Sequence, residues 1–598
     1  MPVWSTRNIF VNGTTYSAFT WANLSATQQT ALDSLTAVLQ PAPAVPAPTV
    51  LTGADIVDYI RGNQAREESQ TNGSLRTRSV PTDSTGWSSL LGDIVNSTPV
   101  FVGAPRADLY NTSPGTWLGK GAYAAFATSA AVANRTPTLW VGANDGMLHA
   151  FNASTGNAAS GAEIYAFIPK ASIDSGLVNV ADPDYEHRYF VDGDSVVADV
   201  WDTTALPAGR WRTILIGTMG RGGPGVFALD ITNPNAVQFL WERNATDIAA
   251  LGHNLGKPVI AQVADGDWRV LLGNGPDSGT GAAQLITIGV ISGAAHVVNA
   301  GNAGSNGMSA VHARDTNADG FADTIYSGDL QGHVYKITNF VSGLPTIVTL
   351  FNATDPSSNP QPIMVAPLVG RDPATGYRWV FFGTGKYLTE TDLTSSQVQT
   401  WYGFRDDNTL VAKTDLLSRT ATGGGDTSGT FTTRLVQEAT AGDLSGRLGW
   451  YINLPVSRER MVVPNQFSGL AQDVLLGLTR IPDPSDVCLP TGRSFLMGIN
   501  AFTGGRLSQT LFDTNNDGEF DDDDKVDDED GVNDEVTGGD GDGANEDVSG
   551  LGFNPGGADF RQIEDLVCVT LDNGTVRCQK IRGSSVQARR GSWREITN

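Results

Sequence analysis

The chain has 598 residues, which exceeds a single compact core and predicts one large repetitive domain with appendages, or several domains. It contains 69 glycines but only 39 lysines and arginines together, a composition typical of an all-β protein rich in turns. The net charge of −25 excludes nucleic acid as an expected partner, because no basic stripe is present to neutralise phosphates. No transmembrane run or signal peptide is recognised, so no membrane insertion is expected, and Met1 is interpreted as a processed start or a fragment edge.

The N-terminal part, residues 1–86, is predicted to be a small helical segment followed by a linker. Residues 25–28 fit a capping box and precede leucines at helical spacing. Residues 41–48 are rich in proline and predict a stiff, extended connection. A second short helix is expected over residues 54–61, with Gly62 as its stop signal.

Short strand-like runs that end in glycine recur along the chain from residue 91 onwards. They are residues 99–103, 138–142, 213–217, 269–273, 324–328, 379–383 and 473–477. Several continue through a tight turn into a second strand. Such units over several hundred residues predict a β-propeller of about seven blades within residues 87–510, in which each blade buries its faces against its neighbours. A set of β-sandwiches is the alternative, and it is disfavoured because no linker interrupts the recurrence.

One loop between two of these strands, residues 315–323, has the spacing of a calcium site. Oxygen-bearing side chains occupy its first, third, fifth and ninth positions, and a glycine occupies the sixth. The predicted ligands are Asp315, Asn317, Asp319, the backbone carbonyl of Phe321, and Asp323. Calcium takes roughly six to eight oxygen ligands, which such a turn can supply. The twelfth position is a tyrosine and the flanks are β-like, so no helix–loop–helix site is predicted; the alternative is a solvated turn.

Residues 511–550 form an acidic insertion with 17 acidic residues and one lysine. Its first part repeats the spacing of the 315–323 loop and adds a carboxylate at the twelfth position. The predicted calcium ligands here are Asp513, Asn515, Asp517, Glu519, Asp521 and Asp524. Two degenerate copies centre on Gly531 and Gly543. Without cations these carboxylates repel one another and the segment should be disordered; a solubilising acidic tail is the alternative.

The C-terminal residues 551–598 are predicted to return to strands and to be a candidate segment for closing the propeller. Cys568 and Cys578 flank a hairpin whose turn centres on Asn573. A three-residue turn would place the two cysteines opposite each other, so a disulfide is predicted, with two inert strand cysteines as the alternative. Cys488 would be left over. A disulfide indicates an oxidising compartment.

Five stretches carry a family resemblance: residues 91–103, 141–151, 220–230, 328–332 and 382–388. Together they resemble the C-terminal region of the PilY family, calcium-binding proteins associated with type IV pilus tips and assembly. The resemblance implies a modified, quinoprotein-like propeller outside the cell, with calcium in the 315–323 loop tuning pilus extension against retraction. The von Willebrand A-like domain that the family commonly carries is not found in this sequence, so adhesion that depends on that domain is not implied.

The expected function is therefore non-enzymatic: a calcium-binding protein at the pilus tip with minor pilins, supporting assembly, attachment to host or abiotic surfaces, and twitching motility. A glycan- or receptor-binding extracellular propeller is the first alternative. A quinone-dependent dehydrogenase is the second, because residues 144–150 also resemble blades of those enzymes, but nothing in the sequence groups a cofactor pocket. No catalytic residue is predicted, since the histidines lack metal spacing and no nucleophile elbow is present. His149 is expected to bond the backbone of a neighbouring blade.

Overall fold

The computed structural model describes residues 3–39, 50–71, 73–78, 90–111, 113–156, 158–205, 208–341, 344–422, 427–428, 431–468, 473–483, 492–526 and 546–582. The chain divides into two compact units, the first chiefly Met1–Gly307 with Ala313–Asp323, and the second chiefly Thr324–Gly591 with Met308–His312. Cys488, Gly531 and Gly543 lie outside the described residues. Among the described helices, none has the length and apolar character needed to span a bilayer.

The first unit contains three sheets. The first has six strands in the order β2-β1-β6-β5-β4-β3, and the other two have four strands each, β10-β9-β8-β7 and β11-β12-β13-β14. The strands are β1 (Ile9–Asn12), β2 (Tyr16–Ala18), β3 (Val100–Val102), β4 (Thr138–Gly142), β5 (Leu148–Asn152), β6 (Glu163–Ile168), β7 (Ser195–Asp202), β8 (Arg210–Thr218), β9 (Gly225–Asp230), β10 (Gln238–Asn244), β11 (Val259–Ala264), β12 (Asp267–Gly273), β13 (Ala282–Gly289) and β14 (Ala295–Ala303).

The sheets of the second unit begin with the four-stranded β15-β16-β17-β18. A five-stranded sheet β19-β20-β21-β25-β22, a six-stranded sheet β23-β24-β29-β28-β27-β26 and a three-stranded sheet β30-β31-β32 follow. The strands are β15 (Met308–Arg314), β16 (Thr324–Asp329), β17 (His333–Thr338), β18 (Thr346–Asn352), β19 (Leu368–Arg371), β20 (Arg378–Gly383), β21 (Thr400–Arg405), β22 (Leu416–Arg419), β23 (Thr427–Ser428), β24 (Phe431–Arg434), β25 (Gly449–Asn453), β26 (Gln466–Ser468), β27 (Val474–Leu478), β28 (Ser494–Asn500), β29 (Gly550–Phe553), β30 (Gly557–Ile563), β31 (Leu566–Leu571) and β32 (Val576–Lys580).

Within each unit, every sheet shares an apolar core with the next sheet along the chain. In the first unit, one core joins β4–β6 to β8–β9 and another joins β7–β10 to β11–β13. In the second unit, three cores join β16–β18 to β19–β21, then β20–β25 to β27–β28, then β27–β29 to β30–β31. Successive small sheets stacked face to face are the arrangement that propeller blades require.

All of the predicted glycine-ending runs are strands: they are β3, β4, β8, β12, β16, β20 and β27 or end directly beside them. The glycine has a packing reason at Gly142, the last residue of β4. A Cβ built on Gly142 would lie 2.3 Å from the carbonyl oxygen of Val191, so a larger residue would push two stretches of backbone apart.

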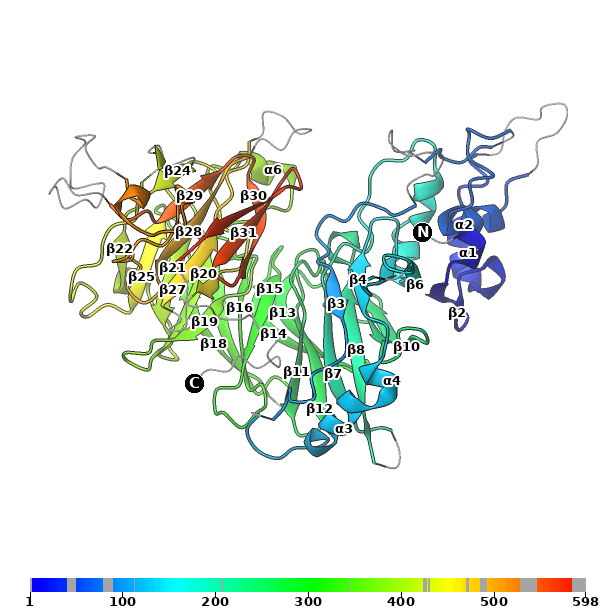
Figure 1. The fold of residues 1–598 in the computed structure, drawn as a ribbon, viewed down its shortest axis with the longest axis horizontal. Helices are drawn as coiled ribbons and strands as arrows, with labels where there is room; N and C mark the ends of the chain where they lie inside the picture. Colours follow the sequence, from blue (N-terminus) through cyan, green and yellow to red (C-terminus); the bar gives the residue numbers. More distant parts are fainter. Residues whose placement is uncertain are drawn as a thin grey trace. The chain divides into compact units, whose positions relative to one another are not determined.

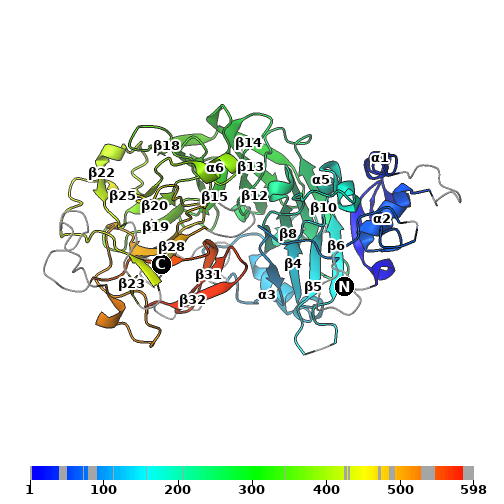
Figure 2. The ribbon, with the colours of Figure 1, turned by 90° about the horizontal axis from the view of Figure 1, so that it is seen from above.

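The N-terminal segment is more than the helical appendage that its sequence predicts. The expected helices are present as α1 (Ala26–Asp33), with the predicted capping box, and α2 (Gly53–Arg61), which ends at Gly62. The strands β1 and β2, which precede α1, were not predicted, and β1 pairs in parallel with β6. Figures 1 and 2 place α1 and α2 next to each other at this edge of the first sheet.

Further short helices that the sequence analysis missed lie between strands. They are α3 (Tyr123–Thr128), α4 (Ala130–Ala133), α5 (Lys170–Asp174) and α6 (Glu390–Thr394), with 3₁₀ turns at Trp4–Thr6, Trp21–Asn23, Lys120–Ala122, Leu177–Ala181, Gly220–Gly222, Lys413–Asp415 and Asp522–Asp524. Figure 1 places α3 and α4 at one end of β7 and β8. Each helix has at most six residues, too few to give an amphipathic repeat that a sequence pattern can reveal.

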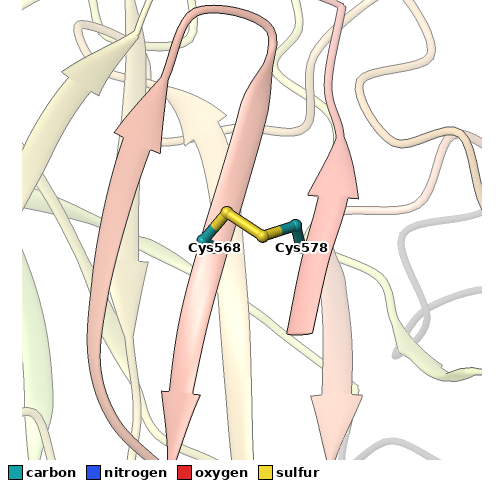
Figure 3. The surroundings of a disulfide bond; sticks show 2 residues. All are labelled: Cys568 and Cys578. Carbon is teal, nitrogen blue, oxygen red and sulfur yellow. A yellow bond between two sulfur atoms is a disulfide. The ribbon is translucent and has the colours of Figure 1, made fainter. Parts of the chain in front are cut away.

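The predicted disulfide is confirmed. Cys568 on β31 and Cys578 on β32 are direct cross-strand partners, and their sulfurs lie 2.02 Å apart (Figure 3). The Leu571 N–H donates to the carbonyl of Thr575 at 2.8 Å, so residues 572–574 form the predicted three-residue turn, in which Gly574 has a φ of 80°. The bond therefore joins the last two strands of the three-stranded sheet.

A buried ionic network ties β1 to the first sheet. Arg7 donates to both carboxylate oxygens of Glu163, at 2.6 and 2.7 Å. His149 contacts Glu163 at 2.8 Å through Nδ1 and Asp145 at 3.0 Å through Nε2. The expectation that His149 bonds the backbone of a neighbouring blade is therefore wrong, because carboxylates of its own sheet and turn occupy both ring nitrogens.

The network sets the charge of its members. Burial would lower the pKa of His149, but the charges and hydrogen bonds of Asp145 and Glu163 outweigh this and raise it from 6.5 to about 9. Burial would raise the pKa of Glu163, but hydrogen bonds from Arg7 and His149 lower it to about 2. His149 is thus an imidazolium in the folded protein at neutral pH.

Replacing His149 by glutamine should produce a pH-dependent loss of stability. A raised folded-state pKa contributes stability that is fully present below pH 6.5 and is lost as the pH rises through about 9. The difference in unfolding free energy between the protein and His149→Gln should therefore shrink by up to about 3 kcal/mol across that window. Urea unfolding at a series of pH values measures it, and a difference that is constant with pH would show that His149 is neutral when folded.

Candidate metal centre

The 315–323 loop joins β15 to β16 and belongs to the first unit. Its end is fixed by backbone hydrogen bonds: Ala322 donates to the carbonyl of Gln262 on β11 at 2.8 Å, and Asp323 donates to the carbonyl of Arg314 at 2.9 Å. The ring of Phe321 packs against the apolar core between β7–β10 and β11–β13. The loop therefore has a fixed base.

The loop curls because its polar side chains accept hydrogen bonds from its own backbone. The Gly320 N–H donates to Asp315 Oδ2 at 2.7 Å, the Asp319 N–H to Asn317 Oδ1 at 3.0 Å, and the Phe321 N–H to Asp319 Oδ1 at 2.8 Å. Gly320 has a φ of 99°, a left-handed conformation that glycine adopts without strain. The sequence thus builds the turn and gathers the predicted ligands Asp315, Asn317 and Asp319 on it.

The closing residue of the loop is Asp323. Both of its carboxylate oxygens accept from Thr316, at 3.1 and 3.2 Å from the backbone N–H, with the closer contact to the hydroxyl at 2.8 Å. This bond brings the ninth position of the loop back to the second. The four predicted side chains and the Phe321 carbonyl therefore belong to one closed turn.

The first residue of the loop, Asp315, has a carboxylate that its surroundings only partly satisfy. Its Oδ1 is buried and has no hydrogen-bond partner among the described residues. Burial raises the pKa of Asp315, and the negative charges of Asp319 and Asp323 raise it further, against the Gly320 N–H, which lowers it. A cation at this point would satisfy the bare oxygen and cancel the repulsion.

The donors decide which cation fits. Within the described ranges, no three His, Cys, Asp or Glu side chains gather closely enough to hold an ion by themselves. Amide and carbonyl oxygens and water would have to complete the ligand set, as they do around calcium, whereas structural zinc needs thiolate or imidazole ligands. The loop offers oxygen donors only, so its chemistry fits calcium.

The 513–524 segment repeats the first part of this geometry. The Gly518 N–H donates to Asp513 Oδ2 at 3.0 Å, the Asp517 N–H to Asn515 Oδ1 at 2.9 Å, and the Glu519 N–H to Asp517 Oδ1 at 2.8 Å. Asp521 and Asp524, the predicted ligands at the ninth and twelfth positions, have different surroundings. Asp524 is buried and accepts from the Thr514 N–H at 2.6 Å, whereas Asp521 is exposed and accepts from the Asp523 N–H at the start of the Asp522–Asp524 turn.

Comparison with known proteins gives consistent matches. The PilY1 beta-propeller domain family matches residues 91–345. The chain is 39% identical over 604 aligned positions to a type IV pilus biogenesis factor PilY1 homolog of Xylella fastidiosa (strain Temecula1), with 100% of this chain and 44% of that protein covered. It is 32% identical over 584 positions to the type IV pilus biogenesis factor PilY1 of Pseudomonas aeruginosa (strain UCBPP-PA14), with 86% of this chain and 47% of that protein covered. The chain thus spans less than half the length of these curated relatives.

A solved structure agrees with these matches. The crystal structure of the Pseudomonas aeruginosa PilY1 C-terminal domain superposes with a TM-score of 0.59 at 27% identity, covering 77% of this chain and 95% of that one. The predicted all-β propeller class and the resemblance to the PilY family are confirmed. The number of blades stays a prediction.

Replacing Asp315 by asparagine should stabilise the protein in a chelator at neutral pH. The asparagine keeps an acceptor for the Gly320 N–H but carries no charge. In the unaltered protein, burial and the charges of Asp319 and Asp323 disfavour the ionised form of Asp315. The gain should be under about 1 kcal/mol because solvent screens the loop, and it should vanish in acid as the Asp315 carboxyl of the unaltered protein becomes protonated. Thermal unfolding in EDTA measures it; a lower unfolding midpoint for Asp315→Asn would show that the carboxylate is already satisfied.

Proposed function

We propose that this chain, which belongs to the PilY1 family, is a calcium-binding, non-enzymatic factor of type IV pilus biogenesis. The observation that carries the pilus role is the identity along the whole chain to a protein named as such a factor. Its relatives are named as biogenesis factors rather than enzymes, which supports the absence of catalysis. The role extends to the balance of pilus extension and retraction, to adhesion and to twitching motility.

The proposed location is the pilus tip at the cell surface, with minor pilins as partners and a host or abiotic surface as the target of attachment. The Cys568–Cys578 disulfide supports an extracytoplasmic site, because such bonds persist in oxidising compartments. The net charge of −25 supports protein partners over nucleic acid.

Calcium acts at the 315–323 loop in this proposal. Asp315, Asn317, Asp319 and Asp323 would hold it with the Phe321 carbonyl, and the ion would supply positive charge that offsets the repulsion between the carboxylates. A ligand shifts an equilibrium only through its different affinity for two states. Calcium would therefore favour the closed loop, and a pilus partner that contacts the closed loop would respond to calcium concentration.

Calcium should stabilise the purified protein through this loop, and Asp323→Asn should remove the effect. At a free calcium concentration of about 100 times the dissociation constant, one site that binds only the folded state adds about 2.7 kcal/mol. Asp277→Asn, a change at an exposed aspartate outside the loop, is the matched control and should respond as the unaltered protein does. Calcium titration during thermal unfolding measures this, and a full response from Asp323→Asn would contradict the assignment of the ligand.

In cells, the paired change Asp315→Asn and Asp323→Asn in the full-length protein should alter the number of surface pili and reduce twitching, while the protein remains present at the surface. Electron microscopy of pili and a motility-zone assay measure the two effects. Unchanged pili and motility, together with binding of the purified chain to a glycan array, would instead support a receptor-binding propeller.

A further inference from the structure

The described residues contain five buried carboxylate oxygens without a hydrogen-bond partner: Glu67 Oε1, Asp202 Oδ2, Asp315 Oδ1, Asp513 Oδ1 and Asp524 Oδ2. The first two lie beside arginines, with Glu67 Oε1 at 3.2 Å from Arg78 and Asp202 Oδ2 at 2.8 Å from Arg212. The other three all lie in the two loops with the same spacing. Two of these three belong to the second loop, residues 513–524.

The two carboxylates of the second loop that have a bare oxygen, those of Asp513 and Asp524, are deeply buried. Asp513 is 2% exposed and Asp524 is 0% exposed. In each, the other oxygen accepts a hydrogen bond from within the loop, so both carboxylates point into it. Leaving a buried charged acceptor unpaired is costly, about 1–3 kcal/mol or more for each group. A cation bound within the loop would satisfy both bare oxygens and offset this cost.

The nearby basic side chains do not complete them. Lys580 Nζ donates to the carbonyl of Gly518 at 2.9 Å, and Arg582 Nη2 donates to the carbonyl of Phe520 at 2.7 Å. Lys525 pairs with the exposed carboxylate of Asp522 at 2.8 Å. These contacts hold the backbone on either side of Glu519, whereas neither Asp513 nor Asp524 forms an ion pair within the described part of the chain.

We propose that residues 513–524 bind a second calcium ion, with Asp513, Asn515, Asp517, the carbonyl of Glu519 and Asp524 as ligands, and that this ion staples the loop to the C-terminal sheet. This site is separate from the 315–323 loop and does not depend on the proposed pilus function. The all-oxygen donor set again fits calcium rather than zinc, and the irregular mixture of donors suits calcium better than the octahedral magnesium ion.

Asp524 takes the place that Asp323 has in the first loop. After Asp521, the chain makes the 3₁₀ turn Asp522–Asp524, which turns the twelfth residue inward. Asp524 then reaches the Thr514 N–H, the equivalent of the Thr316 N–H that Asp323 accepts from. Asp521 caps this turn from the outside and is not a ligand in this assignment.

The link between the loop and the C-terminal sheet consists of backbone contacts and a shared core. Phe512 forms an antiparallel bridge with Ile581, which directly follows β32. The backbone N–H of Asp513 donates to the carbonyl of Lys580 at 3.2 Å, and the backbone N–H of Arg582 donates to the carbonyl of Leu511 at 2.7 Å. Leu511, Phe512 and Ile581 are buried in the same core as β30 and β31. Ordering the loop would therefore slow the opening of the backbone hydrogen bonds at the end of β32, and with it the exchange of their amide hydrogens.

Hydrogen exchange with mass spectrometry tests this in a chain whose first loop is disabled by Asp315→Asn and Asp323→Asn. Calcium at about 100 times the dissociation constant, measured by calorimetry, should slow exchange about 100-fold in residues 511–526 and 576–582. Asp524→Asn should abolish the protection, and Asp521→Asn should keep it. Asp517→Asn, at an exposed ligand position, is a second test if Asp524→Asn does not fold.

Four results would overturn the proposal. The first is calcium-independent exchange in residues 511–526 of the background chain. The second is full protection in folded Asp524→Asn or Asp517→Asn. The third is loss of protection in Asp521→Asn, which would assign the closing ligand to the ninth position. The fourth is equal protection by magnesium at the same concentration, which would remove the assignment to calcium. None of these results depends on whether the first loop binds calcium.

Discussion

Burial of strands on both faces is the constraint on which the rest of this structure depends. The strands β9, β13 and β16 are buried at every position. The apolar faces of such strands must be shielded from water, so a sheet of this kind packs against a neighbouring sheet. The five apolar cores that join successive sheets within the two units meet this requirement. Charged side chains that could bind a metal ion can therefore cluster in the loops between such strands.

The two acidic loops show how much of a binding turn can be built before any ligand arrives. In both, the first, third and fifth residues accept from backbone N–H groups two to five residues ahead, and a glycine adopts a left-handed conformation. These bonds are local, so the sequence spacing alone determines them. The repulsion between the carboxylates remains, and it is this term that a cation can remove.

Local patterns explain what could be predicted from the sequence, and long-range contacts explain what could not. The glycine-ending strands, the capping box at Ser25 and the Cys568–Cys578 hairpin each depend on neighbouring residues. The pairing of Ile9 with Ala166 joins segments that are distant in the sequence. The four residues of β1 are too few to give a pattern that predicts this strand or its partner. The same holds for His149, whose contact with Glu163 follows from the register of β5 and β6. The exposed position of Asp521 and the buried position of Asp524, both predicted ligands, follow from a 3₁₀ turn that a run of acidic residues does not reveal.

The two loops differ in what the loss of an ion would leave behind. In the first loop, the closing Asp323 has both oxygens hydrogen-bonded to Thr316 and is only partly buried, so Asp315 Oδ1 is the buried carboxylate oxygen of this loop without a partner among the described residues. In the second loop, the closing Asp524 is fully buried with one bare oxygen, and the loop is joined to β32. Emptying it leaves a buried charge that the fold must hydrate by opening. The proposed second ion would therefore offset the burial of two such oxygens, Asp513 Oδ1 and Asp524 Oδ2, whereas the proposed first ion would offset that of one, Asp315 Oδ1.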